Sequence, residues 1–238
     1  MNKLHLLFTK DGLQYQILKG KSVIEEKDFF IDEENPQGTI HDQLTKILEN
    51  TTAGSVSIIS ALNHFTLMPE GFDQHDLGYD LIGYNAPVDQ ESEELMLAVN
   101  KKYKVQFYYS FPKILYKSIK DLNIPTNFNF SGEKFLNLIQ TKGQKEIHIN
   151  LYHQQCEFFA LNQKKVILYN NLDVNSEVDF LYFIMFTLSK IGFGTNETHF
   201  YVYGETTENE TFISELRKFV KHLKISFDNI PKKNFILN

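Results

Sequence analysis

Residues 4–31 read LHLLFTKDGLQYQILKGKSVIEEKDFFI, and residues 147–174 read IHINLYHQQCEFFALNQKKVILYNNLDV. The two stretches align without a gap at a constant offset of 143 positions, so that His5 matches His148. Each copy holds three runs of alternating apolar and polar residues joined by short polar turns, which is typical of three successive β-strands. Similarity over such a length indicates an internal duplication, and it decides the architecture before any other feature.

The repeat continues beyond the strands. In the first copy a helix expected over 41–50 precedes an apolar strand over 56–60, and in the second a helix over 178–191 precedes a strand over 200–203. The second helix is apolar almost all round, which is typical of burial on more than one side. Each half therefore reads strand, strand, strand, helix, strand.

The segment 63–145 lies between the two copies, and its mixture of short strands and helices predicts an α+β insertion in the first lobe. We therefore expect an α/β protein with mixed sheets and two related lobes, 1–145 and 146–238. The elements expected within the insertion are strands over 64–68, 95–99, 104–110 and 127–131 and helices over 74–82, 113–122 and 133–140, the second of them opened by Pro112.

Composition is that of an ordinary globular protein, with 42% hydrophobic and 23% charged residues in 238. The single cysteine, Cys156, excludes an internal disulfide framework and favours a reducing compartment. No signal-peptide pattern opens the chain, and no apolar run approaches the roughly 18 residues of a membrane span. These features predict a cytoplasmic protein.

The charge balance disfavours nucleic acid as a partner. Net charge is −6, and Arg217 is the only arginine among 24 basic residues. Arginine is the preferred side chain for phosphate and base-edge recognition, and a nucleic-acid-binding protein usually carries a basic face. The scattered lysine pairs are interpreted as solvated surface.

Several features in a fixed order carry a resemblance to a known family: Asp11-Gly12 in the first hairpin, HFTLMPE at 64–70, the strand and Pro-initiated helix over 105–122, and Tyr203-Gly204-Glu205. With them the chain resembles a bacterial family catalogued only as a domain of unknown function, whose fold is that of actin-like, ribonuclease-H-like ATPases. The resemblance implies this duplicated fold and little about activity.

Actin-like ATPases hold Mg-ATP between their lobes with the first hairpin of each lobe, so the resemblance directs attention to those turns. Asp11-Gly12 in the first turn is interpreted as a two-residue hairpin signal rather than a phosphate loop. The second turn, 151–156, has neither glycine nor carboxylate, and Glu205 after Gly204 disfavours a nearby phosphate. The sequence therefore predicts a relative that does not hydrolyse nucleotide.

Two other groups of residues hold potential ligands. Asp73, His75 and Asp76 offer three metal-ligating side chains within four residues, but a solvated turn or helix start is the favoured interpretation. His5 and His148 fall one step off the apolar phase of their strands. They are either sheet-face residues bonded to neighbours, which is favoured, or a symmetric pair lining the cleft.

Two further groups complete the analysis. The acidic run Glu91, Glu93 and Glu94 is interpreted as an exposed loop or helix start. The aromatic run 107–109 predicts a strand buried on both faces, the alternative being an exposed partner site. Cys156 is expected to be a packing residue. No catalytic, cofactor-binding or metal-binding residue is therefore assigned.

The function expected from the sequence is a non-hydrolysing binding or assembly module of the actin-like fold. It would act on an unidentified protein partner, which includes the case of a homodimer. The alternative is an enzyme: a divergent ATPase or small-molecule kinase that binds nucleotide in the cleft between the lobes.

Overall fold

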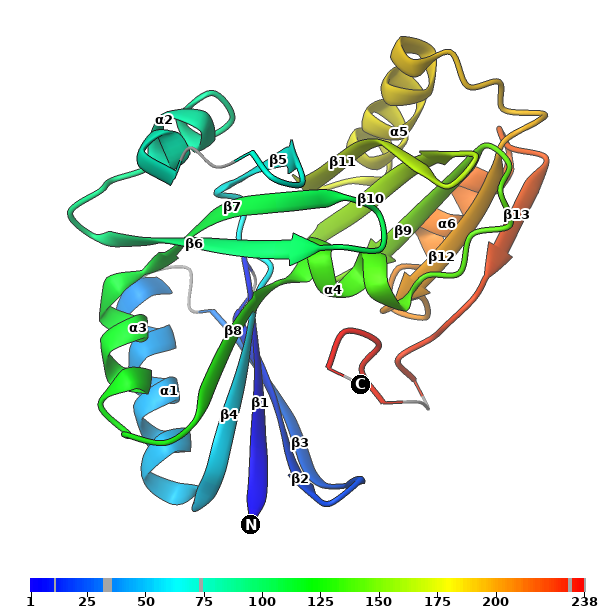
Figure 1. Cartoon of the computed structure of the whole chain (residues 1–238). Coiled ribbons are helices and arrows are strands. Elements are labelled where there is room, and N and C mark those ends of the chain that lie inside the picture. Colours follow the sequence, from blue (N-terminus) through cyan, green and yellow to red (C-terminus); the bar gives the residue numbers. More distant parts are fainter. Residues whose placement is uncertain (11, 32–35, 73–74, 231–232, 238) are drawn as a thin grey trace. The chain divides into compact units, whose positions relative to one another are not determined.

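In a computed structural model, which describes residues 1–10, 12–31, 36–72, 75–230 and 233–237, the chain forms three β-sheets flanked by helices (Figure 1). The first sheet has the order β3-β2-β1-β4-β8 and the second the order β11-β10-β9-β12-β13. The strands of the first sheet are β1 (Asn2–Thr9), β2 (Gly12–Lys19), β3 (Ser22–Phe30), β4 (Ala53–Ser60) and β8 (Thr126–Phe130). Those of the second are β9 (Glu146–Leu151), β10 (Gln155–Asn162), β11 (Lys165–Asp173), β12 (His199–Gly204) and β13 (His222–Ile225).

The two sheets share their register as well as their strand order. In the first sheet His5 pairs with Gln16, and in the second His148 pairs with Phe159, which is the same pairing at the repeat offset. Even the irregularity in the outer hairpin recurs, between Ile17 and Leu18 in one copy and at the equivalent step of β10 in the other. The duplication predicted from the sequence is confirmed at the level of single residue pairs.

Each of the two five-stranded sheets carries a pair of helices on the face that holds its apolar core. In the first sheet α1 (Pro36–Asn50) and α3 (Lys113–Lys120) cover the apolar side of the strands, and in the second α5 (Glu177–Ile191) and α6 (Glu210–Arg217) do so. The first core joins Leu4, Leu6, Phe8, Leu44, Ile58, Leu115 and Ile119, and the second joins Ile147, Ile149, Leu151, Phe180, Ile184, Leu188 and Leu216. Alternate strand residues therefore point away from the helices.

The segment expected to be one insertion divides between two sheets. β5 (Phe65–Pro69), β6 (Glu93–Asn100) and β7 (Val105–Pro112) form a separate sheet of order β5-β7-β6. β8, in contrast, pairs in parallel with β4 and so belongs to the first lobe's own sheet. The expected helix over 74–82 is a 3-10 turn, η1 (His75–Leu77), followed by the short α2 (Gly78–Gly83). Pro112 ends β7 and caps α3 instead of lying in its first turn.

Backbone contacts divide the chain into two compact units, Met1–Lys134 with Leu237, and Phe135–Ile236. The division falls inside α4 (Ser131–Leu138). The lobe boundary expected between 145 and 146 would place all of α4 in the first lobe, and it stays a prediction. Among the described residues, no helix has the length and apolarity that a bilayer span needs.

Helix α5 is buried on one side only, contrary to the expectation from its composition. Phe180, Ile184 and Leu188 enter the core of the second sheet. The opposite face carries Val178, Tyr182 and Phe186, whose exposed fractions are 75%, 60% and 47%. The expectation was wrong because an apolar composition shows only which sides of a helix could be buried. In this chain just one side of α5 is buried against the sheet.

Candidate functional site

The first hairpin has a structural use for its glycine. Gly12 has a φ of +153°, and a Cβ built there would lie 1.9 Å from the carbonyl oxygen of Phe29 on the neighbouring strand. The Gly12 N–H donates to the Thr9 Oγ1 at 3.1 Å, and Thr9 is buried. Asp11 lies outside the described residues. Gly12 is therefore explained by close strand pairing, without a ligand.

The second hairpin is filled by its own side chains. The Tyr152 N–H donates to the Gln155 carbonyl at 2.8 Å, closing the turn, and the Tyr152 hydroxyl donates to Glu157 at 2.6 Å. Tyr152 and Glu157 are buried. A phosphate-binding turn needs small residues whose N–H groups point outward. The residues of this turn do not fit a triphosphate.

Gly204, after the late strand β12, is also required by the fold. Its φ is +87°, and an added Cβ would lie 2.3 Å from the Leu151 carbonyl oxygen. The next N–H, that of Glu205, donates to the same oxygen at 2.9 Å. Gly204 thus allows the end of β12 to approach β9 closely, and the N–H group that follows it is bonded within the second sheet.

The repeat-equivalent histidines have different surroundings. His148 is fully buried, stacks on Tyr201 at 4.9 Å between ring centroids, and bonds to Glu146 and Tyr203, each at 3.1 Å. Burial lowers the pKa of His148 despite Glu146, and therefore the imidazole is neutral. We infer that Nε2–H donates to the carboxylate and that Nδ1 accepts from the Tyr203 hydroxyl.

His5 is half-buried, and its Nδ1 lies 3.1 Å from the Leu237 carbonyl oxygen. Burial lowers its pKa, and the charges of Lys134 and Lys3 lower it further. Both histidines are bonded to neighbours on the faces of their sheets that are turned away from the apolar cores. This arrangement agrees with the favoured interpretation for each of them.

The metal-ligand candidates are not brought together in the described part of the chain. Asp73 lies outside the described residues, as does the side chain of His75, and Asp76 is exposed in η1. Within the described ranges no group of three or more His, Cys, Asp or Glu residues is placed to hold a metal ion. Cys156 is fully buried in the second core, and burial raises the pKa of its thiol, as befits a packing residue.

The interpretation of the acidic run Glu91, Glu93 and Glu94 as an exposed loop or helix start is wrong for Glu93, which begins β6 and is largely buried. Its carboxylate lies 3.0 Å from the Nδ1 of His64, and it accepts a short hydrogen bond from the Ser110 hydroxyl. Register explains the meeting, since β7 pairs with both β5 and β6. The aromatic run on β7 is buried on both faces, as expected.

This His64–Glu93–Ser110 cluster is an ion pair with a bound hydroxyl. The hydrogen bond to Glu93 raises the pKa of His64, so the imidazolium is favoured. Burial raises the pKa of Glu93, but the hydrogen bonds from His64 and Ser110 outweigh it and the pKa is lowered. In a nucleophilic triad the histidine stands between the hydroxyl and the acid. Here the carboxylate stands between them, so Ser110 is not activated.

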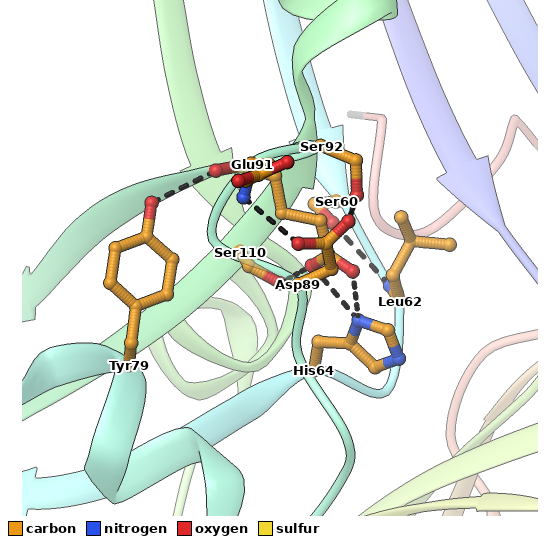
Figure 2. Close-up of polar contacts among 9 residues, drawn as sticks. Ser60, Leu62, His64, Tyr79, Asp89, Glu91, Ser92 and Ser110 are labelled. Carbon is orange, nitrogen blue, oxygen red and sulfur yellow. Dashed lines mark hydrogen bonds and ion pairs between the residues drawn. The ribbon is translucent and has the colours of Figure 1, made fainter.

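The loop before β6 is held in place beside this cluster. Asp89 accepts from the Glu91 N–H at 2.9 Å and from the Ser92 hydroxyl at 2.7 Å (Figure 2). The Lys113 N–H at the start of α3 donates to the Ser92 carbonyl at 2.8 Å. The loop therefore forms one fixed wall at the start of α3.

A groove of about 270 Å³ lies between this wall and the helices of the first unit. Its apolar surface comes from α1 and from the start of α3, where Ile114 is 57% exposed. Its polar groups come from the loop and from Lys113. The lining residues are Ile40, Ser92, Glu93, Pro112, Lys113, Ile114 and Leu115.

Sequence reasoning did not find this site, because its members are far apart in the chain. His64 and Glu93 are 29 positions apart, and Glu93 and Ser110 are 17 apart. No local spacing marks them. The one available signal was a carboxylate directly before the apolar run 95–99, where a buried strand was already expected.

Comparison with protein families shows that the chain belongs to the family described as "Protein of unknown function (DUF3822)", whose profile matches residues 1–223. No curated protein matches the chain. The family resemblance carried by the four sequence features is thereby confirmed.

Solved structures show the same fold at low sequence identity. A Bacteroides thetaiotaomicron protein with an actin-like ATPase fold and unknown function has a TM-score of 0.82 at 16% identity, with 99% of this chain and 93% of that chain covered. A chain of the PilM-PilN type IV pilus biogenesis complex has a TM-score of 0.63 at 10% identity, with 98% of this chain and 92% of that chain covered. The cytoplasmic domain of EpsL, an inner membrane component of the Vibrio cholerae type II secretion system, has a TM-score of 0.51 at 9% identity. The match covers 85% of this chain and 82% of that chain. The expected actin-like ATPase fold is confirmed.

Proposed function

From its membership in a family of unknown function with an actin-like ATPase fold, we propose that this chain is a protein-binding module that does not hydrolyse nucleotide. The observation that carries the proposal is the second hairpin, where Tyr152 and Glu157 fill the place of a phosphate-binding turn. Gly12 and Gly204 support it, because each serves a close backbone approach.

We place the binding site in the groove of the first unit. Its exposed isoleucine and its fixed loop suit one or two apolar side chains of a partner protein, held at a preformed surface. The exposed edge of His64 adds a hydrogen-bond donor close by. Two proteins of similar structure are named for multiprotein assemblies, one of pilus biogenesis and one of secretion, which supports a module of this kind. A cytoplasmic location, with Cys156 reduced, belongs to the same proposal.

Ligand-induced stabilisation tests the nucleotide part of the proposal. Thermal unfolding of the purified chain is followed with Mg-ATP, Mg-ADP or Mg²⁺ alone. A ligand at about 100 times its Kd adds roughly 2.7 kcal/mol of stability, which is several degrees in Tm. We expect no shift with either nucleotide. A shift with Mg-ATP that exceeds the shift with Mg²⁺ would support the divergent ATPase or kinase instead.

Groove substitution tests the binding part. The tagged chain is expressed in its own host and purified as wild type, Ile114→Glu or Ile24→Glu. Ile24 is a matched control, since it is 55% exposed and lies on β3, away from the groove. We expect a stoichiometric protein that accompanies the wild type and Ile24→Glu and is lost with Ile114→Glu. Identical co-purifying proteins in all three samples would exclude the groove as the binding site.

A further inference from the structure

Helix α5 presents an exposed aromatic stripe to solvent. Val178, Tyr182, Phe186 and Lys190 follow one another at intervals of four, so they lie along one side of the helix. The rings of Tyr182 and Phe186 stack at 5.7 Å and 19°, and the ammonium of Lys190 lies 5.1 Å from the Phe186 ring centroid. The stripe is thus an ordered surface, well separated from the buried side of the helix.

Such a surface costs solubility unless something covers it. Isolated exposed apolar residues are ordinary, but three in a row on one helix mark an interaction site. The sequence of α5 is apolar enough for burial on more than one side, and this chain buries one. A partner is therefore needed to account for the composition of the outer side.

We propose that the stripe is the centre of a symmetric homodimer in which α5 of one copy packs antiparallel against α5 of another. The stripe is self-complementary in that orientation. A twofold axis level with Ile184 sets Tyr182 opposite Phe186 of the second copy and Val178 opposite its Lys190. Contacts of this kind are isologous, and each aromatic residue meets the other copy's ring.

The charges of the helix agree with the antiparallel arrangement. At about 100° per residue, Asp179 and Lys190 lie within about 20° of each other around the helix, at opposite ends of the stripe. Both are exposed, and in the antiparallel pair Asp179 is within about 1.5 Å, along the axis, of the second copy's Lys190. A parallel pair would instead place like charges together and align the two helix dipoles unfavourably.

This inference does not rest on the groove, because it concerns the second unit and the purified chain alone. Sedimentation equilibrium from about 1 to 300 µM measures the dimer Kd for wild type, Tyr182→Glu and Phe219→Glu. Phe219 is the matched control, with 54% exposure at a position beyond α6. We expect a concentration-dependent dimer that Tyr182→Glu weakens at least about 10-fold and Phe219→Glu leaves within about 2-fold. A wild-type monomer throughout, or equal effects of both variants, would overturn the proposal.

Orientation is tested by mixing two proteins that each carry one added surface cysteine, Tyr182→Cys and Phe186→Cys, under mild oxidation. Cys156 does not interfere, because it is fully buried. The antiparallel pair predicts a disulfide between the two different proteins in preference to disulfides within either one. Predominant crosslinking of each variant to itself would overturn the antiparallel arrangement. In a second arm, Asp179→Lys and Lys190→Glu should each weaken the dimer, and their combination should restore it.

Discussion

The two five-stranded sheets share their strand order and register, but they differ on the face turned away from the apolar core. In the second sheet this face holds the buried acids Glu146 and Glu157, together with His148 and Tyr201. In the first sheet the position equivalent to Tyr201 is occupied by Ser57. A small residue in place of a ring leaves a pocket of about 260 Å³ lined by His5, Ser57, Asn127 and their neighbours.

Equivalent positions in the two sheets share their strand register, but the side chains around them differ. Backbone pairing fixes where a side chain points, while neighbouring side chains decide whether that place is filled or open. His148 is enclosed between an acid and two tyrosines, whereas His5, at the same position of the repeat, remains half-exposed. We can therefore test the two copies against each other, with each one as the control for the other.

The largest difference is expected between the two histidines. His148→Ala removes two buried hydrogen bonds and two ring stacks and leaves Glu146 unpaired on that side, at a cost of about 3 kcal/mol in the free energy of unfolding. His5→Ala loses one contact at a half-exposed position and should cost under about 1 kcal/mol. Urea unfolding of both variants measures the two values. Equal losses would contradict the comparison.

A smaller difference is expected at the next strand. Tyr201→Ser gives the second sheet the serine that the first sheet has at the equivalent position, Ser57. It opens a cavity beside His148 and should lower the free energy of unfolding by about 2 kcal/mol. Ser57→Ala, at the equivalent position, borders an open pocket and should change stability by less than about 0.5 kcal/mol. Chemical unfolding gives both numbers. A loss at Ser57 matching that at Tyr201 would show that the first face is packed after all.

Acid should destabilise the second sheet through His148. The pKa of His148 is lowered below 6.5 in the folded chain, so between that value and the folded pKa only the unfolded chain takes up the proton. The free energy of unfolding should therefore fall as pH drops below 6.5, by at most about 1.4 kcal/mol per pH unit from this group. His148→Gln should flatten the profile more than His5→Gln. An unchanged slope in His148→Gln would refute the assignment.

The smallest expected effect is a gain. Gln16, equivalent to Phe159, is fully buried, and neither its amide nitrogen nor its amide oxygen has a hydrogen-bond partner among the described residues. Gln16→Met should therefore stabilise the chain by about 1 kcal/mol, since it removes an unpaired buried amide at nearly constant volume. Thermal unfolding measures the gain. A lower Tm would indicate that the amide is satisfied in solution.

Much of the fold was determined by the sequence alone. The offset that matches His5 to His148 also gives the strand pairing of both sheets, because register follows from the alternation of buried residues. The turns, the late strands and the helix before each could be read from local patterns, and so could the burial of both faces of β7. These properties depend on residues close together in the chain.

Local sequence patterns could not predict the His64–Glu93–Ser110 cluster or which side of α5 is covered, because both depend on contacts between segments far apart in the chain. Glu93 became a largely buried ion-pair partner only because β7, which carries Ser110, pairs both with β6 and with the strand that directly follows His64. Helix α5 was apolar on all sides, yet its composition could not reveal that the chain covers one side and leaves Tyr182 exposed. Periodicity tells which residues avoid water. Only the tertiary structure decides what lies against them, because that depends on contacts between segments remote in sequence.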